Sequence, residues 1–136
     1  MKIKNYFTIV FIAFFSITSC KKDSAVTAAT YPIQGLWVGT YTNTSGTFFF
    51  SFSIYPDGTL SYKSKATNNT TYFADGSWFL TDAAFTFNIV TVNASGNQFR
   101  QTGAGIYSSS KGTLTSGTGS DQPSTTPFTW TMTRVN

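Results

Sequence analysis

The sequence predicts an all-β protein, an eight-stranded antiparallel up-and-down barrel. The first observation is that every second residue from Phe48 to Ile54 is a phenylalanine or an isoleucine, a period typical of a strand with one buried face. The second is that turn-forming residues recur every roughly 8 to 15 residues from Gly35 onward. The third is that no segment beyond residue 19 has helical periodicity.

The expected strands are joined by short links, which imply that consecutive strands are antiparallel. Closing the sheet into a barrel removes its aggregation-prone edges. A two-sheet β-sandwich is the alternative arrangement of the same strands. The strands are expected at residues 35–41, 47–55, 59–65, 72–80, 85–89, 98–107, 111–116 and 128–135.

The links between strands contain residues that favour turns. Pro56, Asp57 and Gly58 predict a tight turn, because proline fixes φ and glycine accepts a positive φ. Gly76 in the middle of an expected strand indicates a bulge or a sharp bend. Residues 117–127 are rich in small and polar side chains and are predicted to form a loop.

The amino-terminal residues predict export and lipid attachment. Residues 1–19 carry two lysines before an apolar core of about ten residues, a pattern that indicates a secretory signal and is too short for a membrane span. The signal ends at Ser19, directly before Cys20, in the arrangement of a bacterial lipobox, and Cys20 is the only cysteine of the chain. We therefore expect a lipidated amino terminus and flexible tether at residues 20–32 and one folded domain at residues 33–136.

A lipobox implies a diacylglycerol on the sulfur of Cys20 and several acyl chains, which anchor a protein durably at about 0.8 kcal/mol per buried methylene. The expected localisation is the cell envelope of a Gram-negative bacterium. Lys21 follows the cysteine in place of the aspartate that resembles an inner-membrane retention signal, so we expect the outer membrane.

Several short motifs follow one another along the folded domain. They are GLWVGTY at 35–41, FSI and PDGTL at 52–60, GSWFL at 76–80 with Phe85 and Phe87, GTL at 112–114, and WTM at 130–132. In their order these motifs resemble the small lipocalin-like lipoprotein domains of Gram-negative bacteria, and the resemblance spans nearly all of residues 33–135. It implies a calycin-type barrel. It also implies that Trp37, on the first strand, packs beneath a basic residue of the last strand, and Arg134 matches that position.

The composition excludes most catalytic chemistry. The chain has no histidine and no glutamate, and its single cysteine is the expected lipidation site. A Ser-His-Asp or Cys-His site and a typical zinc site are therefore excluded. Of the five acidic residues only Asp75 falls in an expected strand, and Asp121 falls in the predicted loop. We expect no enzyme activity, no cofactor and no metal.

The basic residues are few and scattered, which does not favour nucleic acid as a partner. Loss of Lys2 and Lys4 with the signal lowers the formal net charge from +4 to +2.

Two functional hypotheses remain for a membrane-anchored, non-catalytic module. One is a carrier that holds a small apolar ligand in the barrel mouth. Its candidate lining is aromatic, and the same rings could instead simply fill the barrel. The candidates are Phe50, Phe52, Tyr62, Trp78, Phe87 and Trp130.

The other hypothesis is an interaction protein that presents its surface to an envelope protein, or that inhibits a secreted enzyme. The aromatic residues expected on the outer face favour it if they form one patch; these are Phe49, Tyr55, Phe73 and Phe79. The volume of any interior cavity separates the two hypotheses, because a pocket of about 300 Å³ or more favours a ligand.

Overall fold

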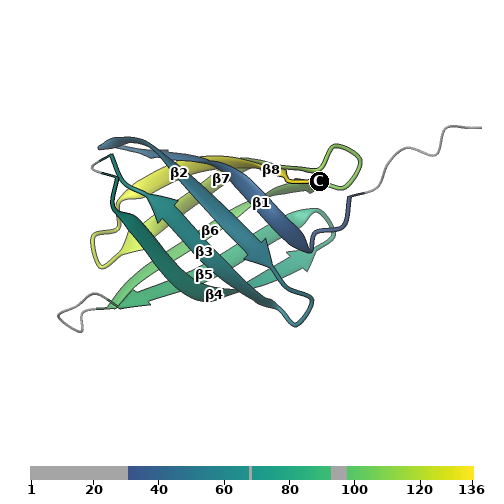
Figure 1. Cartoon of the computed structure of the whole chain (residues 1–136), viewed down its shortest axis with the longest axis horizontal. Helices are drawn as coiled ribbons and strands as arrows, with labels where there is room; N and C mark the ends of the chain where they lie inside the picture. The colour runs from purple at the N-terminus through teal and green to yellow at the C-terminus, as the bar shows by residue number, and fades with distance from the viewer. Residues whose placement is uncertain (1–30, 68, 93–97) are drawn as a thin grey trace, which may run out of the picture.

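The structure is a computed structural model that describes residues 31–67, 69–92 and 98–136. These residues form antiparallel strands that wrap into a barrel (Figure 1). Among them, no helix has the length and apolar character to cross a membrane. The strands are β1 (Gly35–Asn43), β2 (Gly46–Ile54), β3 (Thr59–Lys65), β4 (Thr71–Thr81), β5 (Ala84–Val92), β6 (Gln98–Ser108), β7 (Thr113–Gln122) and β8 (Pro127–Arg134).

Each strand pairs with the next along the chain, and β1 also pairs with β8, so the sheet closes on itself. The closing ladder runs from Trp37 opposite Arg134 to Thr42 opposite Thr129. This confirms the predicted eight-stranded up-and-down barrel. The two-sheet sandwich is wrong, because a sandwich would leave the pairing of β1 with β8 unmade.

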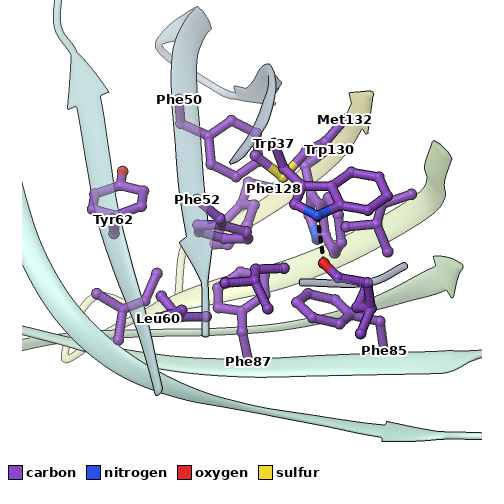
Figure 2. Packing of buried hydrophobic residues seen from close by; sticks show 14 residues of the cluster. Trp37, Phe50, Phe52, Leu60, Tyr62, Phe85, Phe87, Phe128, Trp130 and Met132 are labelled. Atoms are coloured by element: carbon purple, nitrogen blue, oxygen red, sulfur yellow. Dashed lines mark hydrogen bonds between the residues drawn. The ribbon is translucent and has the colours of Figure 1, made fainter. Parts of the chain in front are cut away.

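Large apolar side chains fill the barrel interior (Figure 2). Their alternation along each strand places them on the inner face, and Phe50, Phe52 and Phe87 show the resulting packing. The ring centroids of Phe50 and Phe52 lie 5.2 Å apart, and those of Phe52 and Phe87 lie 5.0 Å apart. The buried core consists of Ile33, Trp37, Phe50, Phe52, Ile54, Leu60, Tyr62, Phe85, Phe87, Ile89, Leu114, Phe128, Trp130 and Met132.

The tight turn between β2 and β3 forms as predicted. Gly58 has a φ of +86°, and the Asp57 carboxylate accepts hydrogen bonds from the backbone N–H and the hydroxyl of Thr59. These two bonds lower the pKa of the Asp57 carboxyl. The turn therefore fixes the register of the hairpin.

The predicted polar loop at residues 117–127 is wrong for most of its length, because β7 continues through Gln122. A β-bulge between Leu114 and Gly117 interrupts the pairing with β8, and Ser116 has a positive φ of 52° at that point. Beyond the bulge, Gly117 and Gly119 face inward, where a Cβ would lie 2.2 Å from the ring of Trp130 and 2.4 Å from the ring of Phe128. The inner face of β7 is left open for rings of β8, so the strand lacks apolar alternation.

Of the bulge or sharp bend predicted at Gly76, the bulge is wrong, since the ladders of β4 with β3 and β5 are regular on both sides of this residue. The reason for a glycine there is close approach of the neighbouring backbone. A Cβ on Gly76 would lie 2.2 Å from the carbonyl oxygen of Asn88.

The two ends of the barrel differ. At one end the residues that precede β1 fold against the barrel: Tyr31 N–H donates to Ser109, and Trp37 Nε1 donates to the Ile33 carbonyl oxygen at 2.6 Å (Figure 2). The carboxyl terminus lies at this same end (Figure 1). We name it the closed end. The last residues of β1, β3, β5 and β7 and the first residues of β2, β4, β6 and β8 lie at the opposite, open end.

Candidate functional site

The open end contains a cavity of about 680 Å³, which we name the cup. Its volume lies within the range of small-molecule pockets, roughly 300–1,000 Å³. The wall consists of residues from the strand ends and the last hairpin, and the hydroxyl-bearing side chain of Tyr62 lies at the floor. The lining residues are Tyr41, Tyr62, Ser64, Thr71, Tyr72, Phe73, Thr91, Val92, Phe99, Arg100, Gln101, Asp121 and Ser124.

Strand register shows which lining side chains point into the cup. Thr91 follows Phe87 and Ile89 on the inner face of β5, and it is paired with Phe99 of β6. Gln101 of β6 is paired with Asp121 of β7, and both lie on that inner face. Tyr72 is on the inner face of β4 opposite Ser64. The cup therefore has a mixed wall of rings, hydroxyls, one amide and one carboxyl.

The predicted ligand lining lies mostly below the cup. Tyr62 is the one candidate that lines it. The others belong to the packed interior, where Trp130 contacts Phe50 and Phe87 with ring centroids 6.2 Å and 5.6 Å apart. Trp78 stacks on Phe85 near the closed end, and its Nε1 donates to the Tyr55 carbonyl oxygen. Thus the aromatic rings of these residues fill the barrel interior below the cup.

Two tyrosine hydroxyls and one carboxyl lie close enough to interact inside the cup. Burial raises the pKa of Tyr41, and the nearby Asp121 carboxylate raises it further. Burial likewise raises the pKa of Tyr62 well above its usual value.

Asp121 is a residue of the cup wall that the sequence analysis missed. It lies in β7 and not in a loop, so Asp75 is not the only strand aspartate. Burial raises the pKa of the Asp121 carboxyl, and a hydrogen bond from the Gln101 side chain lowers it by less. Its Oδ1 is buried without a hydrogen-bond partner among the described residues. The period of two in Gly117, Gly119 and Asp121 was the available signal for an inward position.

The predicted closure pair lies at the closed end. Trp37 and Arg134 are opposite one another in the ladder of β1 with β8. Nε and Nη2 of Arg134 donate to the Gln34 carbonyl oxygen at 3.4 Å and 3.3 Å. The Trp37 ring makes an edge contact with Tyr107, with centroids 6.1 Å apart. Stacking of the guanidinium on the indole remains a prediction.

Two of the four aromatic residues predicted on the outer face line a common groove. Phe49 and Phe73 line a groove of about 400 Å³ on the outer face of β1 to β4, where Lys63 Nζ lies 5.7 Å from the Phe73 ring centroid. Tyr55 and Phe79 lie outside this groove. Phe73 and Phe79 are 67% and 71% exposed. Of the four aromatic residues predicted on the outer face, Phe49 and Phe73 thus share this groove.

The lipobox residues Ser19 and Cys20 lie outside the described residues. Within the described part of the chain, no group of three or more His, Cys, Asp or Glu side chains could hold a metal ion. Compared with known protein families and with curated proteins, the chain matches none. The closed eight-stranded antiparallel barrel is compatible with a lipocalin-like fold.

Proposed function

We propose that the protein is a lipid-anchored, lipocalin-like binding module of the cell envelope, and that its cup holds the apolar part of a small ligand. The observation that carries this proposal is a cavity of about 680 Å³ above a core that is packed with rings. A hollow mouth on a solid barrel offers a defined apolar surface without loss of core packing. The rings of Tyr41, Tyr72 and Phe99 supply that surface.

The membrane anchor of this proposal rests on the lipobox at Ser19 and Cys20. The proposed localisation of the protein is the outer membrane of a Gram-negative bacterium. The proposed function involves no enzyme activity. The expected partners are the membrane, through the acyl chains on Cys20, and the ligand in the cup.

Filling the cup tests the binding function. Thr91→Trp places an indole in the cup, because Thr91 is an inner-face residue of β5 that lines it. Thr86→Trp is the matched control, since Thr86 is an exposed residue of the same strand. Titration with the neutral fluorescent probe N-phenyl-1-naphthylamine is performed on residues 20–136 with Cys20→Ser, which contain every barrel strand.

We expect saturable binding of one probe molecule by the parent protein and by Thr86→Trp, with a Kd on the order of micromolar. Thr91→Trp should weaken binding by about tenfold or more, corresponding to about 1.4 kcal/mol. Absence of saturable binding to the parent protein would refute the proposal. Equal binding by Thr91→Trp would also refute it.

A second candidate function, docking of an envelope protein, is favoured by the outer groove of β1 to β4. Leu36 and Phe49 are exposed on its sides, and small residues such as Ser51 and Ser61 form its floor. Leu36→Ser with Phe49→Ser should abolish capture of such a partner and leave probe binding in the cup unchanged, because neither residue lines the cup. A loss of probe binding in this double variant would instead place the ligand in the groove.

A further inference from the structure

We infer that the ligand of the cup is an amphiphile with a positively charged ammonium head group, and that Asp121 binds this head group. The inference rests on the proposed function, because it names the chemical class that the same cup would take.

The first argument is the state of the Asp121 carboxyl. Oδ1 is buried and accepts no hydrogen bond from the described residues, although the side chain also contacts Gln101. A buried acceptor without a donor is costly to the folded protein. A ligand that brings N–H donors to this oxygen would remove that cost, and an ammonium group brings donors and a complementary charge together.

The second argument is the charge of the cup wall. Among the described residues that line the cup, Asp121 is the one acidic residue and none is a lysine. Arg100 lies at its edge, on the outward row of β6 opposite Val90 and Gln122, and it also lines a separate groove with those residues. The inward-facing charge is therefore negative, which favours a cation over a carboxylate head group.

The third argument is the set of rings around the carboxyl. Tyr41, Tyr72 and Phe99 line the cup from inner-face positions of β1, β4 and β6. The faces of aromatic rings attract ammonium groups as well as apolar chains. The combination of one carboxyl with several rings thus suits a cationic head on a short hydrocarbon chain.

A head-group series tests this inference without any substitution. Octylammonium, octanol and octanoate have the same chain length and differ in charge. Isothermal titration calorimetry at about pH 8, again on residues 20–136 with Cys20→Ser, should show octylammonium bound about tenfold or more tightly than octanoate, with octanol between them. Asp121→Asn should weaken octylammonium binding about tenfold and leave octanol binding within about twofold.

Asp75→Asn is the matched control, because Asp75 is an exposed aspartate of β4 whose carboxylate accepts a hydrogen bond from Ser61 outside the cup. It should leave all three affinities unchanged. Lowering the pH should weaken octylammonium binding to the parent protein as Asp121 takes up a proton, and should not do so in Asp121→Asn. The other charged or ionisable side chains that line the cup are Arg100, Tyr41, Tyr62 and Tyr72.

The outcomes separate the two proposals. If all three compounds bind with equal affinity, or octanoate binds most tightly, the cup binds ligands but the ammonium assignment is overturned. An unchanged octylammonium affinity in Asp121→Asn overturns it as well. If none of the three binds, the proposed function itself fails, and the head-group inference fails with it.

Discussion

Single residues decide how the barrel interior is filled. The inner faces of β6 and β7 carry glycines where the neighbouring strands carry large rings. Gly103 lies against Phe87 of β5, and Gly117 and Gly119 lie against Trp130 and Phe128 of β8. The rings of one strand thus occupy the space that the glycines of the next strand leave, which allows the rings to meet in the centre of the barrel.

Overpacking at Gly103 tests this account of the core. A Cβ there would lie 2.6 Å from two ring carbons of Phe87, so Gly103→Ala should lower the free energy of unfolding by about 1–3 kcal/mol. Phe87→Leu removes those ring carbons. It should therefore lower the free energy of unfolding less in the Gly103→Ala variant than in the parent protein. Denaturant unfolding of the parent, both single variants and the double variant measures the coupling. Strictly additive effects would show that the two side chains do not compete for space.

The carboxyl of Asp121 should reduce stability at neutral pH. Its folded-state pKa is raised above the ordinary value of 3.8 by burial, so between these two pKa values the folded protein binds more protons than the unfolded one. The free energy of unfolding therefore falls as the pH rises through this window. The lowered pKa of Asp57 has the opposite effect on how stability changes with pH. Asp57 is present in every protein that is compared, so its effect cancels.

Asp121→Asn should remove this fall, so its stability relative to the parent should increase as the pH rises from about 4 towards 8. Thermal unfolding across that range measures the difference, and Asp75→Asn again serves as the control. A difference between Asp121→Asn and the parent that stays constant with pH would mean that the carboxyl titrates normally in the fold.

At the scale of the elements, the alternation of apolar and polar residues predicted the strands that have one apolar face. It did not predict the extent of β7, whose inner face carries glycines. The segments around Phe50, Phe85 and Trp130 alternate clearly and were placed correctly. The inner face of β7 carries Gly117 and Gly119, so its inner positions show no apolar signal. The same absence hid the wall position of Asp121, because a side chain in a presumed loop has no defined face.

The candidate site was less predictable than the fold for a physical reason. An inward ring on a barrel strand has the same sequence signature whether it borders a cavity or fills the core. Phe52 and Tyr62 are adjacent in the ladder of β2 with β3, yet only Tyr62 lines the cup. Depth along the barrel axis depends on strand register and stagger, which period-two patterns do not specify.

The closing ladder of β1 with β8 should depend on Arg134. Its guanidinium donates to the Gln34 carbonyl oxygen and holds the segment that enters β1. Arg134→Ala should lower the free energy of unfolding by about 1 kcal/mol, whereas Arg100→Ala, an exposed control at the open end, should change it by less than about 0.5 kcal/mol. Equal effects of the two substitutions in denaturant unfolding would show that Arg134 does not secure the closure.

At the scale of the whole molecule, the described chain enters the barrel at the end opposite the cup. At the closed end, where the chain enters the barrel, the Tyr31 N–H donates a hydrogen bond to the Ser109 carbonyl oxygen. The cup lies at the opposite end. An anchor on Cys20 would therefore direct the cup away from the membrane surface that holds the lipid. This orientation leaves the mouth free for a ligand from the aqueous phase.

Fluorescent labels at the two ends test the orientation on the acylated protein in vesicles. Ser110→Cys places a label at the closed end and Ser124→Cys places one at the open end, and both serines are exposed. Spin-labelled lipids should quench the label at position 110 more strongly than the label at position 124. Stronger quenching at position 124 would contradict the orientation.

The lipid anchor itself is tested by metabolic labelling with a fatty acid. A Cys20→Ser chain should incorporate no labelled fatty acid, and incorporation equal to that of the parent chain would contradict the anchor.

The central claim is that a ligand binds in the cup above a solid core, and its most direct test is the position of the bound probe. Backbone amide chemical shifts of the ¹⁵N-labelled domain, recorded during titration with N-phenyl-1-naphthylamine, provide that position. The account predicts that the largest saturable shifts occur at Thr91, Gln101 and Asp121, which line the cup. Shifts concentrated instead at Ser51 and Lys63, in the groove on the outer face of β1 to β4, would contradict it.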